Sequence, residues 1–306
     1  MHAAHVPLTD RRRQRSSSIL VNFLHIVKKI TIGIFILILI TIGIFGYLLR
    51  VKINHLRNSH IVFVSTHLDG RENLISLVKV VDDQPTTVTF NDELQVPVGK
   101  HGQYRLDAVY PLLKQEKYTD AQIASFYSFI FGQVVDTVIS LPVENGERLD
   151  SQVWLGVRQG TVSVSDAIAI WWLFRSLATE ESSTHITQWS QWNRAREQLF
   201  DPPLIPNCSL AIVNSTDQSG LAQAFNAVLE SEGVEIIRLG SQSEAREKSA
   251  LYRVDESCEE VVEVIKTLSP VALEVEVSQL PTAEYRAALL LVIGEDIAAF
   301  NPQRPD

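Results

Sequence analysis

Residues 30–49 form a segment without charged side chains that consists almost entirely of Ile, Leu, Phe, Gly and Thr. As a helix, about 20 such residues span the ~30 Å hydrocarbon layer of a bilayer. The segment therefore predicts one membrane-spanning helix whose partner is the lipid bilayer. A cleaved signal peptide is the alternative, but its apolar part starts nearer to Met1 and ends in small residues. Here the segment ends in Tyr47 and two leucines before Arg50, which favours an uncleaved anchor.

Basic side chains are distributed unevenly around this segment. Six Lys and Arg residues precede it, and three follow it before residue 58. Positively charged flanks stay on the cytoplasmic side of a membrane helix. We therefore expect residues 1–29 to form a basic cytoplasmic tail that suits the anionic inner leaflet. The chain is predicted to be a single-pass plasma-membrane protein with extracytoplasmic C-terminal domains.

The chain after residue 57 is strongly acidic. The first 57 residues hold nine of the 27 Lys and Arg residues and one of the 36 Asp and Glu residues, which leaves a net charge of −17 for the remainder. Nucleic-acid binding depends on Lys and Arg side chains that neutralise phosphates. The composition therefore argues against nucleic acid as a partner.

Residues 58–200 alternate between strand and helix patterns, which is typical of an α/β domain with a central sheet. Strands are expected at 61–65, 74–81, 86–90 and 134–141, and helices at 106–113, 120–131 and 167–177. We expect Gly132 to end the second of these helices and Asp166 to cap the third. All five tryptophans lie between Trp154 and Trp192. A sugar-binding platform is the alternative, but Trp171 and Trp172 lie within a continuous apolar run, which favours packing.

Three prolines in residues 201–206 indicate a linker. Residues 207–298 then predict a small α+β domain, in which two amphipathic helices cover a sheet of four or five strands. The strands are expected at 209–214, 234–239, 250–254, 271–277 and 287–293, and the helices near 221–229 and 261–268. Residues 299–306 are expected to form a tail.

The chain has two cysteines, Cys208 and Cys258. Outside the cell a disulfide is permitted, and closing a loop of this length stabilises by about 4 kcal/mol on the chain-entropy model. Two buried thiols are the alternative, and the sequence leaves both open. Asn207 and Asn214 begin glycosylation triplets, which we interpret as structural because such triplets are frequent and the second lies at a strand-to-helix turn.

The last domain resembles the C-terminal domain of LytR-CpsA-Psr (LCP) cell-envelope proteins. The residues that carry the resemblance are SLAIVNSTDQSGLAQAFNAVLESEGVEIIRL at 209–239, the strand at 250–254, and LLLVIGEDIA at 289–298. In that family the domain is an accessory module without an assigned catalytic role. The resemblance implies a role in binding at the cell wall.

The upstream domain is similar to a degenerate form of the family's catalytic domain, which binds a polyprenyl pyrophosphate through arginines and a metal-binding Asp. Arg71 stands in a segment where the family has Arg-x-Asp-Thr, and Asn73 replaces the Asp. Asp92 follows Asn91, where the family has Arg-Asp. Arg105 falls at a basic position of the family, before a segment in which Asp107 stands in place of the family's Asn. Of the late arginine-bearing helix only Arg175 remains.

The resemblance therefore leaves two functional hypotheses open. With several ligands lost, we expect a non-catalytic protein that binds or scaffolds at the cell wall, without a cofactor. The alternative is an LCP-type phosphotransferase that attaches a polyprenyl-pyrophosphate-linked glycopolymer to peptidoglycan, with Arg71, Asp92 and Arg105 as vestigial candidates. Mg²⁺ would then stabilise the leaving group, and Asp92 is the candidate metal ligand. The sequence lacks a Gly-x-Gly-x-x-Gly motif, a phosphate loop and a Gly-x-Ser-x-Gly elbow.

Overall fold

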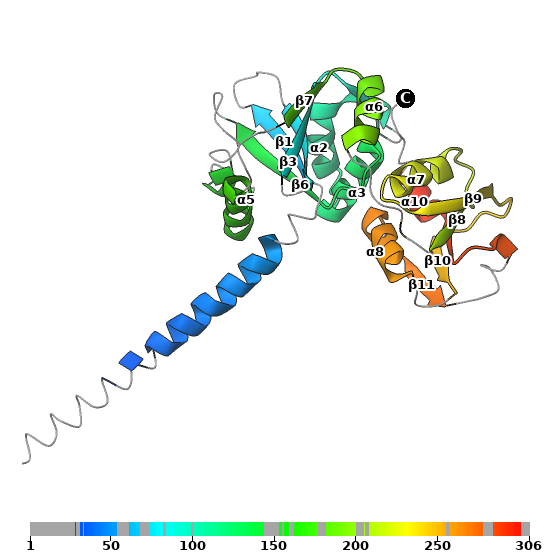
Figure 1. The fold of residues 1–306 in the computed structure, drawn as a ribbon. Coiled ribbons are helices and arrows are strands. Elements are labelled where there is room, and N and C mark those ends of the chain that lie inside the picture. Colours follow the sequence, from blue (N-terminus) through cyan, green and yellow to red (C-terminus); the bar gives the residue numbers. More distant parts are fainter. Residues whose placement is uncertain are drawn as a thin grey trace, which may run out of the picture. The chain divides into compact units, whose positions relative to one another are not determined.

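Figure 1 shows the computed structural model of the chain, which contains a sheet-rich core and one N-terminal apolar helix. The mixed α/β class predicted from the sequence is confirmed. The chain divides into two compact units, Met1–Lys52 and Ile53–Asp306. The structure describes residues 28, 31–32, 34–53, 61–67, 74–81, 84–98, 101–143, 153–154, 156–158, 162–176, 182–199, 205, 208–254, 258–277 and 284–300.

The N-terminal helix Ile34–Ile53 has 20 residues and a mean hydropathy of 2.5. Most of its large apolar side chains are exposed, and Leu37 is 64% exposed. By length and composition this helix is suited to crossing a membrane, and a signal sequence has the same features. The helix continues past Arg50, beyond the predicted 30–49, because arginine is itself a good helix former. Apart from one residue, the predicted tail 1–29 lies outside the described residues.

The first sheet has the strand order β6-β1-β2-β3-β7. Its strands are β1 (Ile61–His67), β2 (Leu74–Val81), β3 (Gln84–Phe90), β6 (Thr137–Val143) and β7 (Ser182–Ile186). β1, β2 and β3 form an antiparallel meander, whereas β6 pairs parallel with β1 and β7 pairs parallel with β3. Side chains alternate along each strand, so that Val62, Val64, Ile75 and Leu77 share one buried core.

Three helices contribute to this core: α2 (Leu106–Gln115), α3 (Asp120–Phe131) and α6 (Trp189–Leu199). Thr119 begins α3 with a capping box that includes Gln122. Gly132 ends α3 in the left-handed conformation, at φ 63°. The prediction that Gly132 stops this helix is confirmed, because glycine adopts that conformation without a steric penalty.

Several sequence predictions differ from the structure in this part of the chain. The strand expected at 134–141 begins at Thr137, and neither β7 nor α6 was expected. Both missed elements are rich in Ser, Thr and Gln, which hides their periodicity. Asp166 does not cap α5 (Val164–Ser176); its backbone N–H donates to Ser163 Oγ at 3.1 Å, so Ser163 is the capping residue.

The second sheet has the order β11-β10-β12-β8-β9. Its strands are β8 (Ser209–Asn214), β9 (Glu235–Ser241), β10 (Ala250–Arg253), β11 (Glu274–Val277) and β12 (Leu289–Ile293). Helices α7 (Leu221–Glu230) and α8 (Glu259–Leu268) share a core with Leu210, Ile212 and Leu291. The alternate residues Ala211, Val213 and Leu290 form a smaller cluster with Tyr285. Both helices therefore contribute to the core on one face of this sheet.

Helix α3 joins the cores of the two sheets. Every residue from Ile123 to Phe131 is buried. Phe126 and Ile130 belong to the core of the first sheet, whereas Phe129 packs into the core of the second, 4.9 Å from the ring of Phe225. A helix that is apolar on all sides needs partners on all sides. Most of the predicted linker 201–206 lies outside the described residues, and the parts on either side belong to one compact unit.

Candidate functional site

Asp92 lies in the turn that follows β3. The N–H of Asn91 donates to the carbonyl of Ile186, at the end of the neighbouring β7, and its side-chain oxygen accepts the N–H of Glu93 at 2.8 Å. These bonds hold the turn against the end of the sheet. Asp92 is only 4% exposed. A carboxylate buried to this degree requires a charged or hydrogen-bonding partner.

Arg105 supplies that partner. It ends the hairpin of β4 (Gln95–Pro97) and β5 (Gln103–Arg105) and directly precedes α2. The N–H of Leu106 donates to the carbonyl of Leu94 at 2.8 Å, which ties the start of α2 to the turn that carries Asp92. The hairpin thereby brings Asp92 and Arg105, which are 13 positions apart, into contact.

The guanidinium of Arg105 binds two carboxylates. Its Nη2 donates to Asp92 Oδ2 at 2.5 Å and to Asp107 Oδ2 at 3.2 Å, and its Nε donates to Asp107 Oδ1 at 3.2 Å. The side chain of Arg105 is half exposed, whereas those of Asp92 and Asp107 are 5% and 11% exposed. Asp107 raises the pKa of Arg105 most, and Asp92 and Glu93 add to the effect.

This triad of Asp92, Arg105 and Asp107 is unsuited to holding a polyphosphate. Two carboxylates outweigh one guanidinium, and the exposed Glu93 adds further negative charge nearby. Nε and Nη2 of Arg105 are bonded to the two carboxylates, so an anion that approaches the guanidinium also meets their negative charge. The described residues also include no group of three His, Cys, Asp or Glu side chains placed to hold a metal ion.

The structure describes the remaining candidates of the sequence only in part. Arg71 and Asn73 lie outside the described residues. Arg175 lies on α5. Of the three candidate residues, the structure therefore brings Asp92 and Arg105 together. It adds Asp107, which sequence comparison treated only as a replacement for Asn, although its position two residues after Arg105 was a signal for an ion pair.

A hollow of about 420 Å³ lies beside the triad, between the turn after β3 and the start of α6. Because β3 and β7 are parallel, their carboxyl ends meet at this edge of the sheet. Most of its lining residues have polar side chains, among them Asn91, Gln95 and Gln188. The indole N–H of Trp189 donates to the carbonyl of Gln95 at 2.9 Å.

The tryptophans of α6 are core residues rather than a platform. Trp192 is fully buried and donates to the carbonyl of Phe131, and Trp189 is 8% exposed. Both rings pack against Phe90. Trp154 is exposed to 40%. The two buried indoles thus belong to the core of the first sheet. Packing was predicted from Trp171 and Trp172; Trp171 is half-buried, and the side chain of Trp172 lies outside the described residues.

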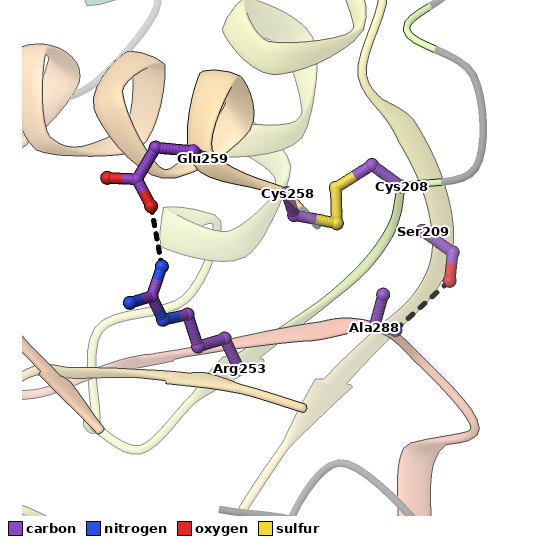
Figure 2. The surroundings of a disulfide bond; sticks show 6 residues. All are labelled: Cys208, Ser209, Arg253, Cys258, Glu259 and Ala288. Carbon is purple, nitrogen blue, oxygen red and sulfur yellow. Dashed lines mark hydrogen bonds and ion pairs between the residues drawn. A yellow bond between two sulfur atoms is a disulfide. The ribbon is translucent and has the colours of Figure 1, made fainter. Parts of the chain in front are cut away.

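The two cysteines form a disulfide. Figure 2 shows the bond between Cys208, directly before β8, and Cys258, directly before α8. Their Cα atoms are 5.6 Å apart, across a sequence separation of 50 residues. Beside it, Arg253 Nη1 pairs with Glu259 Oε2 at 2.6 Å, and Ser209 Oγ accepts the N–H of Ala288 at 3.2 Å (Figure 2). The bond fastens α8 to the sheet.

Asn214 serves the local fold. Its Nδ2 donates to the carbonyl of Gln218 at 2.7 Å, and its Oδ1 accepts bonds from the backbone and hydroxyl of Thr216. The residue is 7% exposed, so its side-chain amide is buried and hydrogen-bonded to neighbouring residues. This geometry agrees with a structural role, whereas Asn207 lies outside the described residues.

The candidate site is thus an ion-paired triad beside a hollow at the carboxyl ends of β3 and β7. Comparison of the chain with protein-family models, curated proteins and solved structures finds no match. Among the described residues, the triad carries more negative than positive charge, and its arginine is bound by its own two carboxylates.

Proposed function

We propose that this chain is a membrane-anchored bacterial cell-envelope protein that binds or scaffolds at the cell wall without catalysing a reaction. The apolar helix Ile34–Ile53 supports anchoring in the plasma membrane. The Cys208–Cys258 disulfide supports an oxidising compartment for the part that follows. The charge bias around the helix favours a cytoplasmic N-terminus.

The triad carries the proposal that the protein is not an enzyme. Polyprenyl-pyrophosphate transfer requires positive charge that stabilises the leaving group in the transition state. Arg105, however, is already bound by Asp92 and Asp107 at 2.5 and 3.2 Å. The guanidinium therefore serves to neutralise buried carboxylates, and in the part of the site that the structure describes the acids leave no surplus of positive charge.

The C-terminal part supports a binding role. Residues 207–298 resemble the LytR C-terminal domain, which is an accessory module in its family. The disulfide fastens α8 to its own sheet, and α3 contributes to the cores of both sheets. We infer that the two sheets together present a surface to a cell-wall component or an envelope protein.

A combined transfer and binding assay tests the proposal. The purified full chain in detergent is incubated with Mg²⁺, peptidoglycan and a polyprenyl-pyrophosphate-linked glycopolymer. We expect no transfer above the protein-free background, and we expect the chain to sediment with purified cell wall. Arg105→Ala should leave sedimentation unchanged. Lys114→Ala is the matched control, because it removes a basic side chain of α2 that forms an ion pair with Asp120, and it should also leave sedimentation unchanged.

The phosphotransferase alternative gains if Mg²⁺-dependent transfer is observed and is lost in Arg105→Ala but kept in Lys114→Ala. The close approach of Asp92 and Arg105 is the observation that favours this alternative. Because Arg105→Ala leaves two carboxylates unpaired, circular dichroism must show that the variant is folded.

A further inference from the structure

Two sets of hydrogen bonds connect α3 to the second sheet's layer. The first set joins α3 to the end of α8: Ser125 Oγ donates to the carbonyl of Leu268 at 2.5 Å, and Gln122 Nε2 donates to the carbonyl of Pro270 at 3.3 Å. The second set is a single bond just after α3, in which the backbone N–H of Val134 donates to Glu232 Oε1 at 3.0 Å. The first set is formed by neutral groups, whereas the second contains a carboxyl group that can bind a proton.

Backbone hydrogen bonds fix the turn that carries Glu232. After α7, the N–H groups of Glu232 and Val234 both donate to the carbonyl of Leu229, at 3.1 Å. Gly233 lies between them at φ 78°, a conformation that suits glycine. The N–H of Ile205 donates to the carbonyl of Gly233 at 2.9 Å. The carboxyl of Glu232 is therefore presented from a defined position.

The segment that receives Glu232 is fixed in the same way. The N–H of Gln133 donates to the carbonyl of Ser128, and the N–H of Val135 donates to Ser128 Oγ at 2.8 Å. The N–H of Val134, between them, has Glu232 as its acceptor. Because an unpaired buried N–H is costly, this bond completes the end of α3.

We propose that Glu232 is a proton-controlled latch, which holds the C-terminal layer to α3 tightly when its carboxyl is protonated and more loosely when it is ionised. The proposal does not depend on what the chain binds. It makes the contact between the two sheets responsive to the pH of the surrounding medium.

The charged groups around Glu232 set the pH range of the latch. Burial raises the pKa of Glu232 to about 7, although the hydrogen bond from Val134 and the charge of Lys79 on β2 both lower it. Asp136, in the segment before β6, raises it further. Burial in turn lowers the pKa of Lys79. The guanidinium of Arg196 on α6 lies nearby, bonded to the carbonyl of Gly132 at 2.8 Å.

The sign of the effect follows from linkage. Below about pH 4.5, Glu232 is protonated whether the contact is closed or open, and the contact is at its strongest. Between that pH and about 7, the open form loses the proton while the closed form retains it. The contact therefore weakens as the pH rises through this range and changes no further above it.

Hydrogen exchange of the full chain in detergent tests the latch. After correction for intrinsic exchange, we expect the segment 123–135 to open roughly 10- to 30-fold more often at about pH 8 than at about pH 5.5. Glu232→Gln keeps an acceptor oxygen but cannot ionise, so this ratio should fall to about 1. Glu230→Gln, an exposed glutamate at the end of the same helix, should keep the wild-type ratio.

Ser125→Ala serves as the structural control, because it weakens the neutral set of bonds. It should raise opening by a similar factor at both pH values and leave the ratio unchanged. Lys79→Met should move the midpoint of the pH response upward, since a positive charge that lowers the pKa of Glu232 is lost. A wild-type ratio near 1, an unchanged ratio in Glu232→Gln, or an unmoved midpoint in Lys79→Met would each overturn the proposal.

Discussion

Gly294, directly after β12, occupies a position without room for a side chain. A Cβ atom there would lie 2.6 Å from the backbone carbon of Lys248 and 2.8 Å from the backbone nitrogen of Ser249. The N–H of Gly294 also donates to Ser249 Oγ at 2.8 Å, and Asp296 Oδ1 accepts the N–H of Ser249. The requirement for glycine here is therefore steric and does not depend on its φ angle.

Gly294→Ala should lower the free energy of unfolding by about 1–3 kcal/mol, because backbone atoms have to move. Chemical denaturation of the full chain measures this loss. Gly240→Ala is the matched control, since its Cβ would meet Val213 Cγ2 at an ordinary 3.8 Å. Equal losses in the two variants would contradict the steric explanation.

Among the elements, α3 is the helix that contributes buried side chains to the cores of both sheets. Phe126 and Phe129 are three positions apart on it, yet they belong to the cores of different sheets. A helix placed in this way couples the two cores, because its displacement opens both.

Phe129→Ala should destabilise by about 3–5 kcal/mol, because a buried ring and its contact with Phe225 are lost. Hydrogen exchange should rise more in β8 than in β1. Phe126→Ala, on the same helix, should give the opposite order. The same exchange pattern in both variants would show that α3 does not divide its faces between the two cores.

At the scale of the whole molecule, the disulfide is the one covalent bond between distant parts of the described chain. Cys208→Ala combined with Cys258→Ala should lower the free energy of unfolding by about 4 kcal/mol, because the unfolded chain is no longer constrained. Urea unfolding with and without a reductant measures the effect. The reductant should shift the wild-type midpoint and leave that of the double variant in place; an unaffected wild-type midpoint would refute this account.

The candidate site was predictable only in its parts. Asp92 and Arg105 were selected from a family resemblance, and the 13 positions that separate them are few enough for a hairpin to bring them into contact. Their charge balance was not predictable, because it depends on the hairpin β4–β5, which turns the guanidinium toward Asp92 and Asp107 at once. Glu232 was not selected at all, since no local pattern marks a glutamate that a distant segment covers.

Local patterns in the sequence were sufficient to predict the apolar helix, the three strands at 61–90 and the strand-helix alternation of residues 209–293. These features depend on side-chain periodicity and on turn residues within a few positions of one another. Only the tertiary structure decided that the cysteines form a bond, that β7 and α6 exist, and that α3 serves two cores. Those outcomes depend on which distant segments bury one another, and that choice is made by long-range packing.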